Sequence, residues 1–480
     1  MKRKLLHPAV ALVAAMITIA LAALAADPTI SVSAQQRYPW NGLVDLHFTI
    51  TGTSGTKYDT SFTAKDMVGN TNIAMRTIRK ADGTAAAATT EQLLPGTYSW
   101  VWDAAADLPK DWKCDRVIVT GKAIGGFSYS VKFNANGGTG TMSNESFDYG
   151  TAKALTANAF KRTGYTFQGW ATSASGAKVY NDKQSVSNLT ETSGAVVNLY
   201  AVWKSALYMV IDLSSGSSSS SYPVSYLDAV PSGGWGNAYK TTKLVLRRID
   251  PGSFMMGGQY NVTISKRFYM GIFEVTQKQW ELIVGSNPVT VDKSIGDQRP
   301  VQQIVWNTIR GNSNTHNWPS VVTVDSNSFI GRLRKRTSQN FDLPTEAQWE
   351  YACRAGTTSK YNNGGNTEND LKLVGWFFDN QTRSTAENVG SLRPNNWGLY
   401  DMHGNQSEFC LDWKGPLTAG TDPKGPNSDT TSYSPSRVVR GGSWSYAASG
   451  CTSSYREGKQ PSTTDGYITY GFRICLTLSE

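Results

Sequence analysis

Residues 343–352 read LPTEAQWEYA, and this stretch decides how the C-terminal half of the chain begins to fold. Thr345 is a favourable helix N-cap, and Gln348 stands three residues later, which is the spacing of a capping box. We therefore predict a helix from Glu346 to Arg354. A second N-cap, Thr276, predicts another short helix directly after it. The surrounding sequence is rich in Gly, Asn and Trp, so we expect an α+β domain with short strands and many loops.

Further sequence blocks precede and follow this helix in a fixed order. They are LVLRRI (244–249) with PGSFMMG (251–257), FYMG (268–271) with EVTQKQW (274–280), RPV (299–301), NWGLYDMHGN (396–405), RGGSW (440–444) and GFR (471–473). In this order the blocks resemble the formylglycine-generating enzyme family, also called sulfatase-modifying factors. The resemblance covers residues 243–480 and implies a compact, loop-rich fold related to C-type lectins.

The resemblance also implies a chemistry, which this chain does not keep intact. Enzymes of the family oxidise a cysteine within a Cys-x-Pro-x-Arg motif to formylglycine, and they hold copper(I) through two cysteines after the Arg-Gly-Gly-Ser block. Counted from Ser443, those two positions fall on Tyr446 and Cys451. A phenol does not replace a soft thiolate as a copper(I) ligand, so we expect no copper site. Ser407 further replaces a tryptophan that the family places beside its substrate.

The remaining cysteines suggest disulfides, because an exported chain permits them. We expect Cys451 to be a structural half-cystine with Cys410 as its partner. The resemblance implies a second bridge between Cys353 and Cys475, although Cys475 stands one residue later than the family pattern. Cys114 would remain free in its own domain.

A calcium site is implied by the resemblance at the DMHGNQSE segment. Asp401, Gly404, Gln406 and Glu408 fall at the family's ligand spacing, with two carboxylates and two backbone carbonyls. Oxygen ligands in a tight loop suit calcium. A plain turn with solvated acidic side chains is the alternative interpretation.

Two functions follow from these residues. In the first, the domain is non-catalytic and has a binding or structural role at the cell envelope. A cleft around Arg440, Ser443 and Trp444 would then bind a peptide, protein or glycan by hydrogen bonding and stacking. In the second, the domain is an active sulfatase-modifying oxidase with an altered site. The incomplete cysteine pair favours the first function.

The N-terminus has the pattern of a secretory signal over residues 1–26. Basic residues 2–4 precede an apolar stretch, residues 8–22, and Ala23-Leu24-Ala25 forms a cleavage site. A membrane anchor is the alternative, but the apolar run is short and polar sequence follows at once. No later stretch is apolar enough to span a bilayer. We therefore expect a secreted or envelope protein.

Two β-rich modules are predicted between the signal and the C-terminal domain. In residues 27–126, Leu46, Phe48 and Ile50 alternate with polar residues, which predicts strands of an immunoglobulin-like sandwich. Residues 127–204 contain VKFNANGG (131–138), KRTGYTFQGW (161–170) and LYAVW (199–203), which resemble the Listeria–Bacteroides repeat of bacterial surface proteins and imply a small β-grasp-like module. Residues 205–242 are expected to be a strand and a serine-rich linker.

Length and charge agree with this modular interpretation. A chain of 480 residues is long enough for about three domains. The formal net charge of +9 includes the basic signal, and the short run of basic residues 332–336 is interpreted as a solvated face. We therefore expect no nucleic-acid partner. The four histidines form no metal-binding motif, which argues against a histidine-based metal enzyme.

Overall fold

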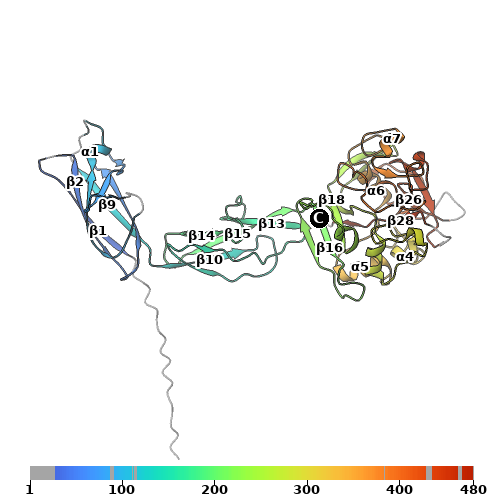
Figure 1. The fold of residues 1–480 in the computed structure, drawn as a ribbon, viewed down its shortest axis with the longest axis horizontal. Helices are drawn as coiled ribbons and strands as arrows, with labels where there is room; N and C mark the ends of the chain where they lie inside the picture. Colours follow the sequence, from blue (N-terminus) through green and yellow to red (C-terminus); the bar gives the residue numbers. More distant parts are fainter. Residues whose placement is uncertain are drawn as a thin grey trace, which may run out of the picture. The chain divides into compact units, whose positions relative to one another are not determined.

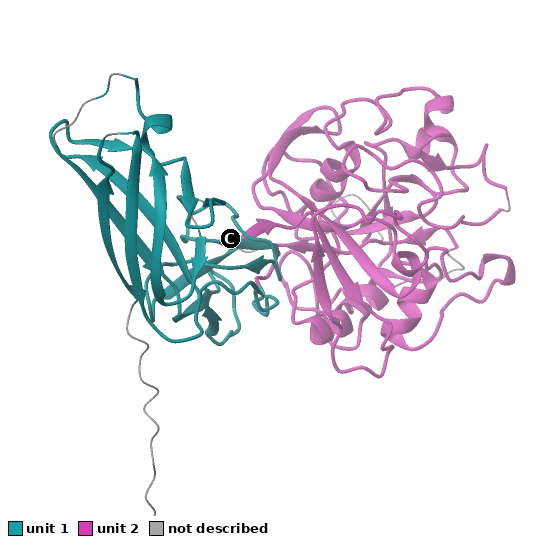
Figure 2. Cartoon of the chain, turned by 60° about the vertical axis from the view of Figure 1, so that its left-hand side comes forward, with its two compact units in different colours: residues 1–161, 167–202 teal, residues 162–166, 203–480 magenta. Residues whose placement is uncertain are grey.

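The computed structural model of the chain describes residues 28–39, 41–86, 91–110, 112, 116–382, 384–428, 435–462 and 468–478. The predicted signal segment and Cys114 lie outside these ranges. The chain divides into two compact units (Figure 2): unit 1 contains the residues up to 161 and residues 167–202, and unit 2 contains residues 162–166 and 203–480. Within the described ranges, no helix is both long and apolar enough to cross a membrane.

The first part of unit 1 consists of two antiparallel sheets (Figure 1, blue). One sheet has the order β1 (Thr29–Gln36), β2 (Leu43–Thr51), β8 (Gly96–Asp103), β5 (Ile78–Lys80) and β6 (Ala85–Ala86), and the other contains β4 (Thr71–Ile73), β3 (Tyr58–Asp66), β7 (Glu91–Leu93) and β9 (Val117–Ile124). Leu46, Phe48 and Ile50 are buried in one core, as their alternation predicts. Phe62 of the second sheet lies 4.7 Å from Phe48 between ring centroids, so the two sheets share that core. A short helix, α1 (Ala104–Asp107), follows β8.

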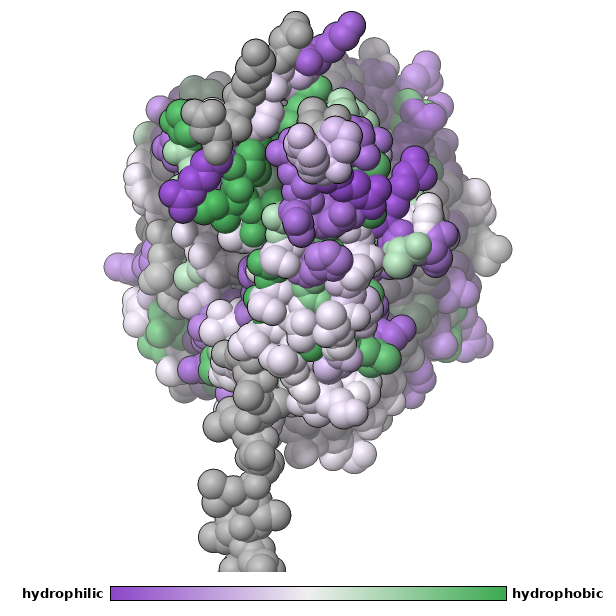
Figure 3. Space-filling view, turned by 90° about the vertical axis from the view of Figure 1, so that its left-hand side faces the viewer, coloured by the Kyte–Doolittle hydropathy of each residue, from purple (hydrophilic) through white to green (hydrophobic). Residues whose placement is uncertain are grey.

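The exposed face of the first sheet carries small polar side chains. His47 Nδ1 lies 2.9 Å from Ser99 Oγ, and the hydroxyl oxygens of Thr49 and Thr97 are 3.0 Å apart across neighbouring strands. Figure 3 looks toward this part of the chain, where pale, weakly polar residues dominate the front. Such cross-strand pairs stabilise a solvated sheet face.

The second part of unit 1 is a mixed sheet. Its strands, in sheet order, are β11 (Glu145–Asp148), β10 (Ser128–Asn134), β15 (Val196–Ser205) and β13 (Tyr165–Ala171), and β12 (Lys153–Ala154) pairs with β14 (Ser185–Val186). The two central strands, β10 and β15, run parallel. The aromatic core predicted from the repeat is present, because Trp170 is fully buried with Phe133 and Phe167 within 5 Å of its ring.

Unit 2 is built around a five-stranded sheet with several smaller sheets beside it (Figure 1, green to red). The five-stranded sheet has the order β17 (Val224–Leu227), β16 (Tyr208–Asp212), β18 (Lys243–Ile249), β21 (Phe268–Gly271) and β29 (Cys475–Thr477). The smaller sheets are β19 (Gly252–Met256), β20 (Tyr260–Ile264) and β25 (Gly420–Thr421); β22 (Gly375–Trp376) and β23 (His403–Gly404); and β27 (Arg456–Lys459), β26 (Arg437–Arg440), β24 (Ser407–Trp413) and β28 (Tyr470–Gly471).

Both predicted helices of unit 2 are present. Helix α3 (Gln277–Val284) begins after Thr276 and α6 (Glu346–Arg354) after Thr345, each with a complete capping box. The other helices are α2 (Ala238–Thr241), η1 (Asp292–Ser294), α4 (Trp306–Arg310), α5 (Phe329–Thr337), α7 (Glu368–Leu371) and η2 (Ala448–Cys451). The structure is therefore mostly β with few helices, as expected.

Two sequence interpretations of this region need correction. The basic run lies on α5 and is not simply solvated, because Arg334 pairs with Asp342 at 3.0 Å. The strand predicted within residues 205–242 is present as β16, but the rest of the stretch is not simply a linker, because β17 pairs with β16 at the edge of the central sheet of unit 2. The serine-rich stretch is fixed by Arg336, whose Nε donates to the Ser219 carbonyl at 2.9 Å.

Candidate functional site

The RGGSW block turns the chain sharply at the end of β26. Gly441 and Gly442 have φ values of 89° and 70°, in the left-handed region that favours glycine. A Cβ on Gly442 would lie only 2.3 Å from the Gly450 carbonyl oxygen, so the turn also needs close backbone approach. The turn leads directly to Tyr446 and Cys451, the two positions that the sequence aligns with copper-binding cysteines.

Tyr446 is part of a cluster of three tyrosines and one glutamate, all half-buried or buried. We call it the tyrosine cluster: Tyr446, Tyr455, Glu457 and Tyr470. The Tyr446 hydroxyl donates to the Glu457 carboxylate and lies 3.3 Å from the Tyr470 hydroxyl. Burial and these neighbours raise the pKa of Tyr446 above its ordinary value. The phenol therefore remains protonated and is no anionic metal ligand.

Cys451 is fully buried in a small apolar cluster with Tyr361, Leu371, Val374, Phe377 and Ala448. Its Sγ lies 3.8 Å from the Ser443 carbonyl oxygen, which also accepts a hydrogen bond from the Tyr446 amide at 3.0 Å. Burial raises the pKa of the Cys451 thiol to about 12. At neutral pH the side chain is a thiol, whereas copper(I) binds the thiolate.

His403 lies against Cys451, and the sequence analysis assigned it no role. Its Nε2 accepts a hydrogen bond from the Asn362 amide at 3.0 Å, so Nδ1 carries the proton and donates to the Cys451 carbonyl at 2.8 Å. The side chain is fully buried, and burial lowers its pKa to about 4. Its place in the NWGLYDMHGN block, one of the blocks that resemble the family, is the one signal that pointed to it.

The two predicted disulfides are absent: all four cysteines of unit 2 are free and buried. Cys353 Sγ lies 3.8 Å from His403 Nε2, and Cys475 Sγ lies 3.8 Å from Gln348 Oε1. Cys410 belongs to a different apolar cluster from Cys451. Cys353 and Cys475 share that cluster with Cys410, so separate clusters account only for the absence of the Cys410–Cys451 bridge.

The DMHGNQSE segment forms a buried polar site, but Glu408 is not a free ligand. Both of its carboxylate oxygens bind Arg473, at 2.6 Å each, and Oε2 also accepts from Trp349 Nε1 at 2.7 Å. A ligand role for Glu408 would therefore require it to share its oxygens with an arginine. The sequence-based ligand set is corrected in this respect.

Glu274 is a second acidic residue of this site, and sequence reasoning missed it. Its carboxylate accepts from Asn405 Nδ2 at 2.7 Å and from the Gln406 amide at 2.8 Å. Burial and the nearby charges of Asp401 and Glu408 raise its pKa well above the usual range. The residue comes from the EVTQKQW block, more than a hundred positions earlier in the chain, so only the tertiary structure brings it here.

Asp401 is the residue of this site that is best suited to bind a cation. Its Oδ2 accepts from the Gly390 amide at 2.6 Å, whereas Oδ1 is buried and has no hydrogen-bond partner among the described residues. Burial raises its pKa to about 6. The charges that act on Asp401 are the carboxylate of Glu408, which raises its pKa, and the cationic groups of Arg473 and Lys240, which lower it. However, the described part of the chain contains no group of three or more His, Cys, Asp or Glu side chains arranged around one metal position.

The predicted cleft residues are also buried. Arg440 is 1% exposed and pairs with Glu350 and, at 3.4 Å, with Glu346. Ser443 is fully buried, and Trp444 is 8% exposed. Arg440 therefore holds α6 against β26 and does not line a surface cleft, which corrects the sequence interpretation.

The side chains that do reach the surface here are aromatic. Tyr446 and Tyr455 are half-buried and meet edge to face, with 6.1 Å between ring centroids. Phe378 is 60% exposed, and its amide donates to the Tyr446 carbonyl at 2.9 Å. Ser407, which stands where the family places a tryptophan beside its substrate, is buried in β24.

Comparison with known proteins identifies two family matches. Residues 237–478 match the model of the sulfatase-modifying factor enzyme 1-like domain, and residues 129–202 match the Listeria–Bacteroides repeat domain. Both matches agree with the resemblances seen in the sequence blocks.

Individual relatives are more distant. The chain is 27% identical over 245 residues to the chaperone protein LppX of Paenibacillus barcinonensis, covering 44% of this chain and 81% of that protein. It is 34% identical over 151 residues to the formylglycine-generating enzyme of Streptomyces coelicolor, covering 27% of this chain and 45% of the enzyme. The bovine enzyme is 27% identical over 230 residues, covering 38% of this chain and 58% of the enzyme. The matches therefore span less than two thirds of these two enzymes.

Two solved structures resemble about half of the chain weakly. Treponema denticola variable protein 1 has 25% sequence identity and a TM-score of 0.39, and the match covers 49% of this chain and 96% of that one. PvdO from Pseudomonas aeruginosa has 21% identity and a TM-score of 0.37, and the match covers 49% of this chain and 94% of that one.

Proposed function

The chain belongs to the family of sulfatase-modifying factor enzyme 1-like domains, and from this membership we propose that it is an exported, modular protein whose family domain is a non-catalytic binding module. The observation that carries this proposal is the Tyr446 hydroxyl bound to Glu457. A neutral phenol stands at the position where the family chemistry requires a thiolate. The alternative, an active oxidase, would need a second soft ligand near Cys451, and the other cysteines of unit 2 are buried beside other groups.

A ligand-binding role is supported by the aromatic surface that replaces the catalytic pair. Tyr446, Tyr455 and Phe378 present partly exposed rings, and Tyr446 is bound to the Glu457 carboxylate. Aromatic side chains are enriched in binding surfaces because they combine large contact area with few rotatable bonds. We propose a peptide, protein or glycan as the ligand, and no nucleic acid, since the positive charge is scattered.

The N-terminal modules fit a spacer or adhesion role at the cell envelope. We propose that residues 27–126 form an immunoglobulin-like sandwich and that residues 127–204 form a β-grasp-like module. The sandwich is supported by the core that its two sheets share. The β-grasp-like module is supported by its mixed sheet, in which the two central strands run parallel. Residues 1–26 would direct export and then be removed.

We also propose a structural calcium ion bound by Asp401 and the backbone carbonyls of Gly404 and Gln406. The buried, unpartnered Asp401 Oδ1 and the neighbouring acidic side chains of Glu274 and Glu408 support this. Glu408 would serve mainly as the counter-ion of Arg473. A bound cation would offset negative charge at a site where Glu274 and Asp401 otherwise favour their protonated forms.

A direct assay tests the catalytic part of the proposal. The mature chain is incubated with copper, a reductant, oxygen and a peptide that contains Cys-x-Pro-x-Arg, and the peptide mass is followed. We expect no conversion to formylglycine. Tyr446→Cys is the matched variant: gain of activity there would support the alignment of this position, whereas robust turnover by the unchanged chain would disprove the non-catalytic assignment.

A further inference from the structure

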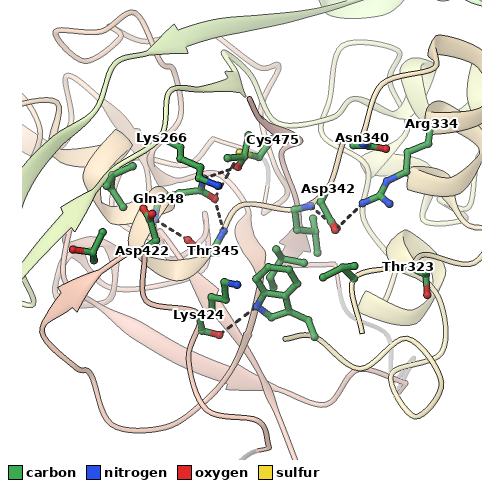
Figure 4. Close-up of a pocket in the computed structure, with 17 residues that line it drawn as sticks. Lys266, Thr323, Arg334, Asn340, Asp342, Thr345, Gln348, Asp422, Lys424 and Cys475 are labelled. Carbon is green, nitrogen blue, oxygen red and sulfur yellow. Dashed lines mark hydrogen bonds and ion pairs between the residues drawn. The ribbon is translucent and has the colours of Figure 1, made fainter. Parts of the chain in front are cut away.

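Unit 2 contains a cavity of about 640 Å³ that shares no residue with the tyrosine cluster. Its walls come from β20, β25, β29, the C-terminal half of α5, the start of α6 and the loop that carries Trp318 and Val322 (Figure 4). Pockets for small molecules have volumes of roughly 300–1,000 Å³. The cavity therefore has the size of a small-molecule site.

The acidic side chains of this cavity already have partners. Asp342 accepts from Arg310 Nε at 2.9 Å and pairs with Arg334 at 3.0 Å. Asp422 accepts from the Ser265 amide at 2.9 Å and from the Ser265 hydroxyl. The charge of Asp342 is thus compensated by two arginines, whereas Asp422 is hydrogen-bonded by a neutral serine and keeps its negative charge.

The basic side chains at the rim are not compensated in the same way. Lys266 and Lys424 line the cavity and are exposed, and in Figure 4 they lie on either side of Thr345. Neither ammonium group pairs with a carboxylate in the described part of the chain; Lys424 Nζ lies 5.7 Å from the centre of the Trp318 ring. Thr345 also places the positive end of the α6 dipole at the cavity. Lys266, Arg334 and Lys424 together outnumber Asp342 and Asp422, so the ionisable side chains that line the cavity carry a net positive charge.

The cavity also has an apolar part. Ile264, Val322, Leu343 and Leu411 contribute aliphatic side chains to its wall. Val322 is 61% exposed, although a side chain of this type is normally shielded from water. A ligand that covers it would gain from burying apolar surface.

We propose that this cavity is a second binding site, which takes a small organic anion: a carboxylate or sulfonate joined to an apolar portion. The anionic group binds between Lys266 and Lys424, and the apolar portion packs against Val322 and Leu343. The site is independent of the function proposed for the tyrosine cluster, because the two share no residue.

The test uses the mature chain and two fluorescent probes of similar shape. One is 8-anilinonaphthalene-1-sulfonate, which is anionic, and the other is N-phenyl-1-naphthylamine, which is neutral. We expect saturable binding of both. The double variant Lys266→Glu/Lys424→Glu should weaken binding of the anionic probe by at least about tenfold, and leave the neutral probe within a factor of about two, because charge reversal replaces an attraction by a repulsion.

Two further variants make the test specific. Lys335→Glu/Lys360→Glu changes the net charge equally at exposed lysines that do not line the cavity, and should leave both affinities unchanged. Val322→Trp fills the cavity from an exposed position and should remove binding of both probes without lowering the melting temperature. The proposal is overturned if the chain binds no anionic probe, if Val322→Trp binds it normally, or if both double variants weaken it equally.

Discussion

At the scale of single residues, Tyr446 and His403 are both uncharged side chains that are held in place by hydrogen bonds. Tyr446 keeps its proton and donates it in a hydrogen bond to the Glu457 carboxylate. His403 keeps a neutral ring because it donates through Nδ1 and accepts through Nε2. Protonation of His403 would break the bond from Asn362, since Nε2 would become a second donor. Both side chains therefore keep one protonation state, and their hydrogen bonds fix their positions.

This state of His403 predicts sensitivity to acid. Its pKa is about 4 in the folded chain and about 6.5 when unfolded, so its contribution is full above pH 6.5 and is lost as the pH falls to 4. The loss amounts to about 1.4 kcal/mol per pH unit. Urea unfolding at several pH values should show a flatter acid dependence in His403→Asn, which keeps a donor for the Cys451 carbonyl.

The chain must be compared with His403→Asn, because other buried groups change stability with pH in the opposite direction. Burial raises the pKa of Asp401 to about 6 and that of Asp412 to about 7. Their protonated forms are favoured in the folded state, so they add stability as the pH falls. An unchanged acid dependence in His403→Asn would contradict the assigned role.

Asp401 carries the calcium prediction. If the ion binds only the folded chain, a chelator should lower the melting temperature, because a ligand at 100 times its dissociation constant adds about 2.7 kcal/mol. Asp401→Asn should melt at the same temperature with and without chelator. Asp422→Asn is the control, since its carboxylate serves only Ser265 among the described contacts, and it should keep the full effect. Metal analysis that finds no calcium in the unchanged protein would refute the prediction.

At the scale of elements, α5 fixes a segment that has no regular structure of its own. Arg336 Nε donates to the Ser219 carbonyl at 2.9 Å, and Nη1 donates to the Ile283 carbonyl at 2.7 Å and to the Tyr222 hydroxyl at 3.0 Å. Tyr222 in turn is buried in the main core of unit 2. One guanidinium thus connects the serine-rich stretch to two helices.

Arg336→Lys should therefore loosen residues 214–222. A lysine keeps the charge but cannot reach several acceptors with a fixed fork, so we expect a loss of about 2 kcal/mol. Hydrogen exchange of these residues should become faster. Lys335→Ala, an exposed position on the same helix, is the control and should leave exchange unchanged. Equal exchange in Arg336→Lys would show that the stretch is held by other contacts.

At the scale of the whole molecule, unit 2 is larger than the stretch that matches its family. The match begins at residue 237, whereas β16 begins at Tyr208 and pairs with β18. Met209, Ile211 and Leu213 are at most 1% exposed and belong to the main core. The sheet is therefore completed by residues that precede the family match, among them the strand predicted before the serine-rich stretch.

Truncation tests this boundary. A chain that begins at residue 203 should unfold cooperatively, whereas one that begins at residue 243 should not. Each buried aliphatic side chain contributes about 1.5–3 kcal/mol, and three of them approach the 5–15 kcal/mol that stabilises a typical domain. Calorimetry of both truncated chains decides the question, and similar melting temperatures would place β16 and β17 outside the folded unit.

The sequence by itself determined the features that depend on residues close together in the chain. The N-caps at Thr276 and Thr345 act over three residues, and the alternation in β2 repeats every second residue, so local spacing was sufficient to predict them. The identity of Tyr446 also needed only counting. These features indicated the family, the β-rich modules and the incomplete cysteine pair.

Only the tertiary structure decided which charges and thiols are buried together. Glu274 meets Gln406, Glu408 meets Arg473, and His403 meets Cys451, across gaps of 48 to 132 residues. No periodicity encodes such contacts, because they arise when separate elements pack around one core. The same packing buried Arg440 and left the four cysteines of unit 2 as free thiols. Cys451 lies in a different apolar cluster from Cys410, a separation that spacing along the chain does not encode.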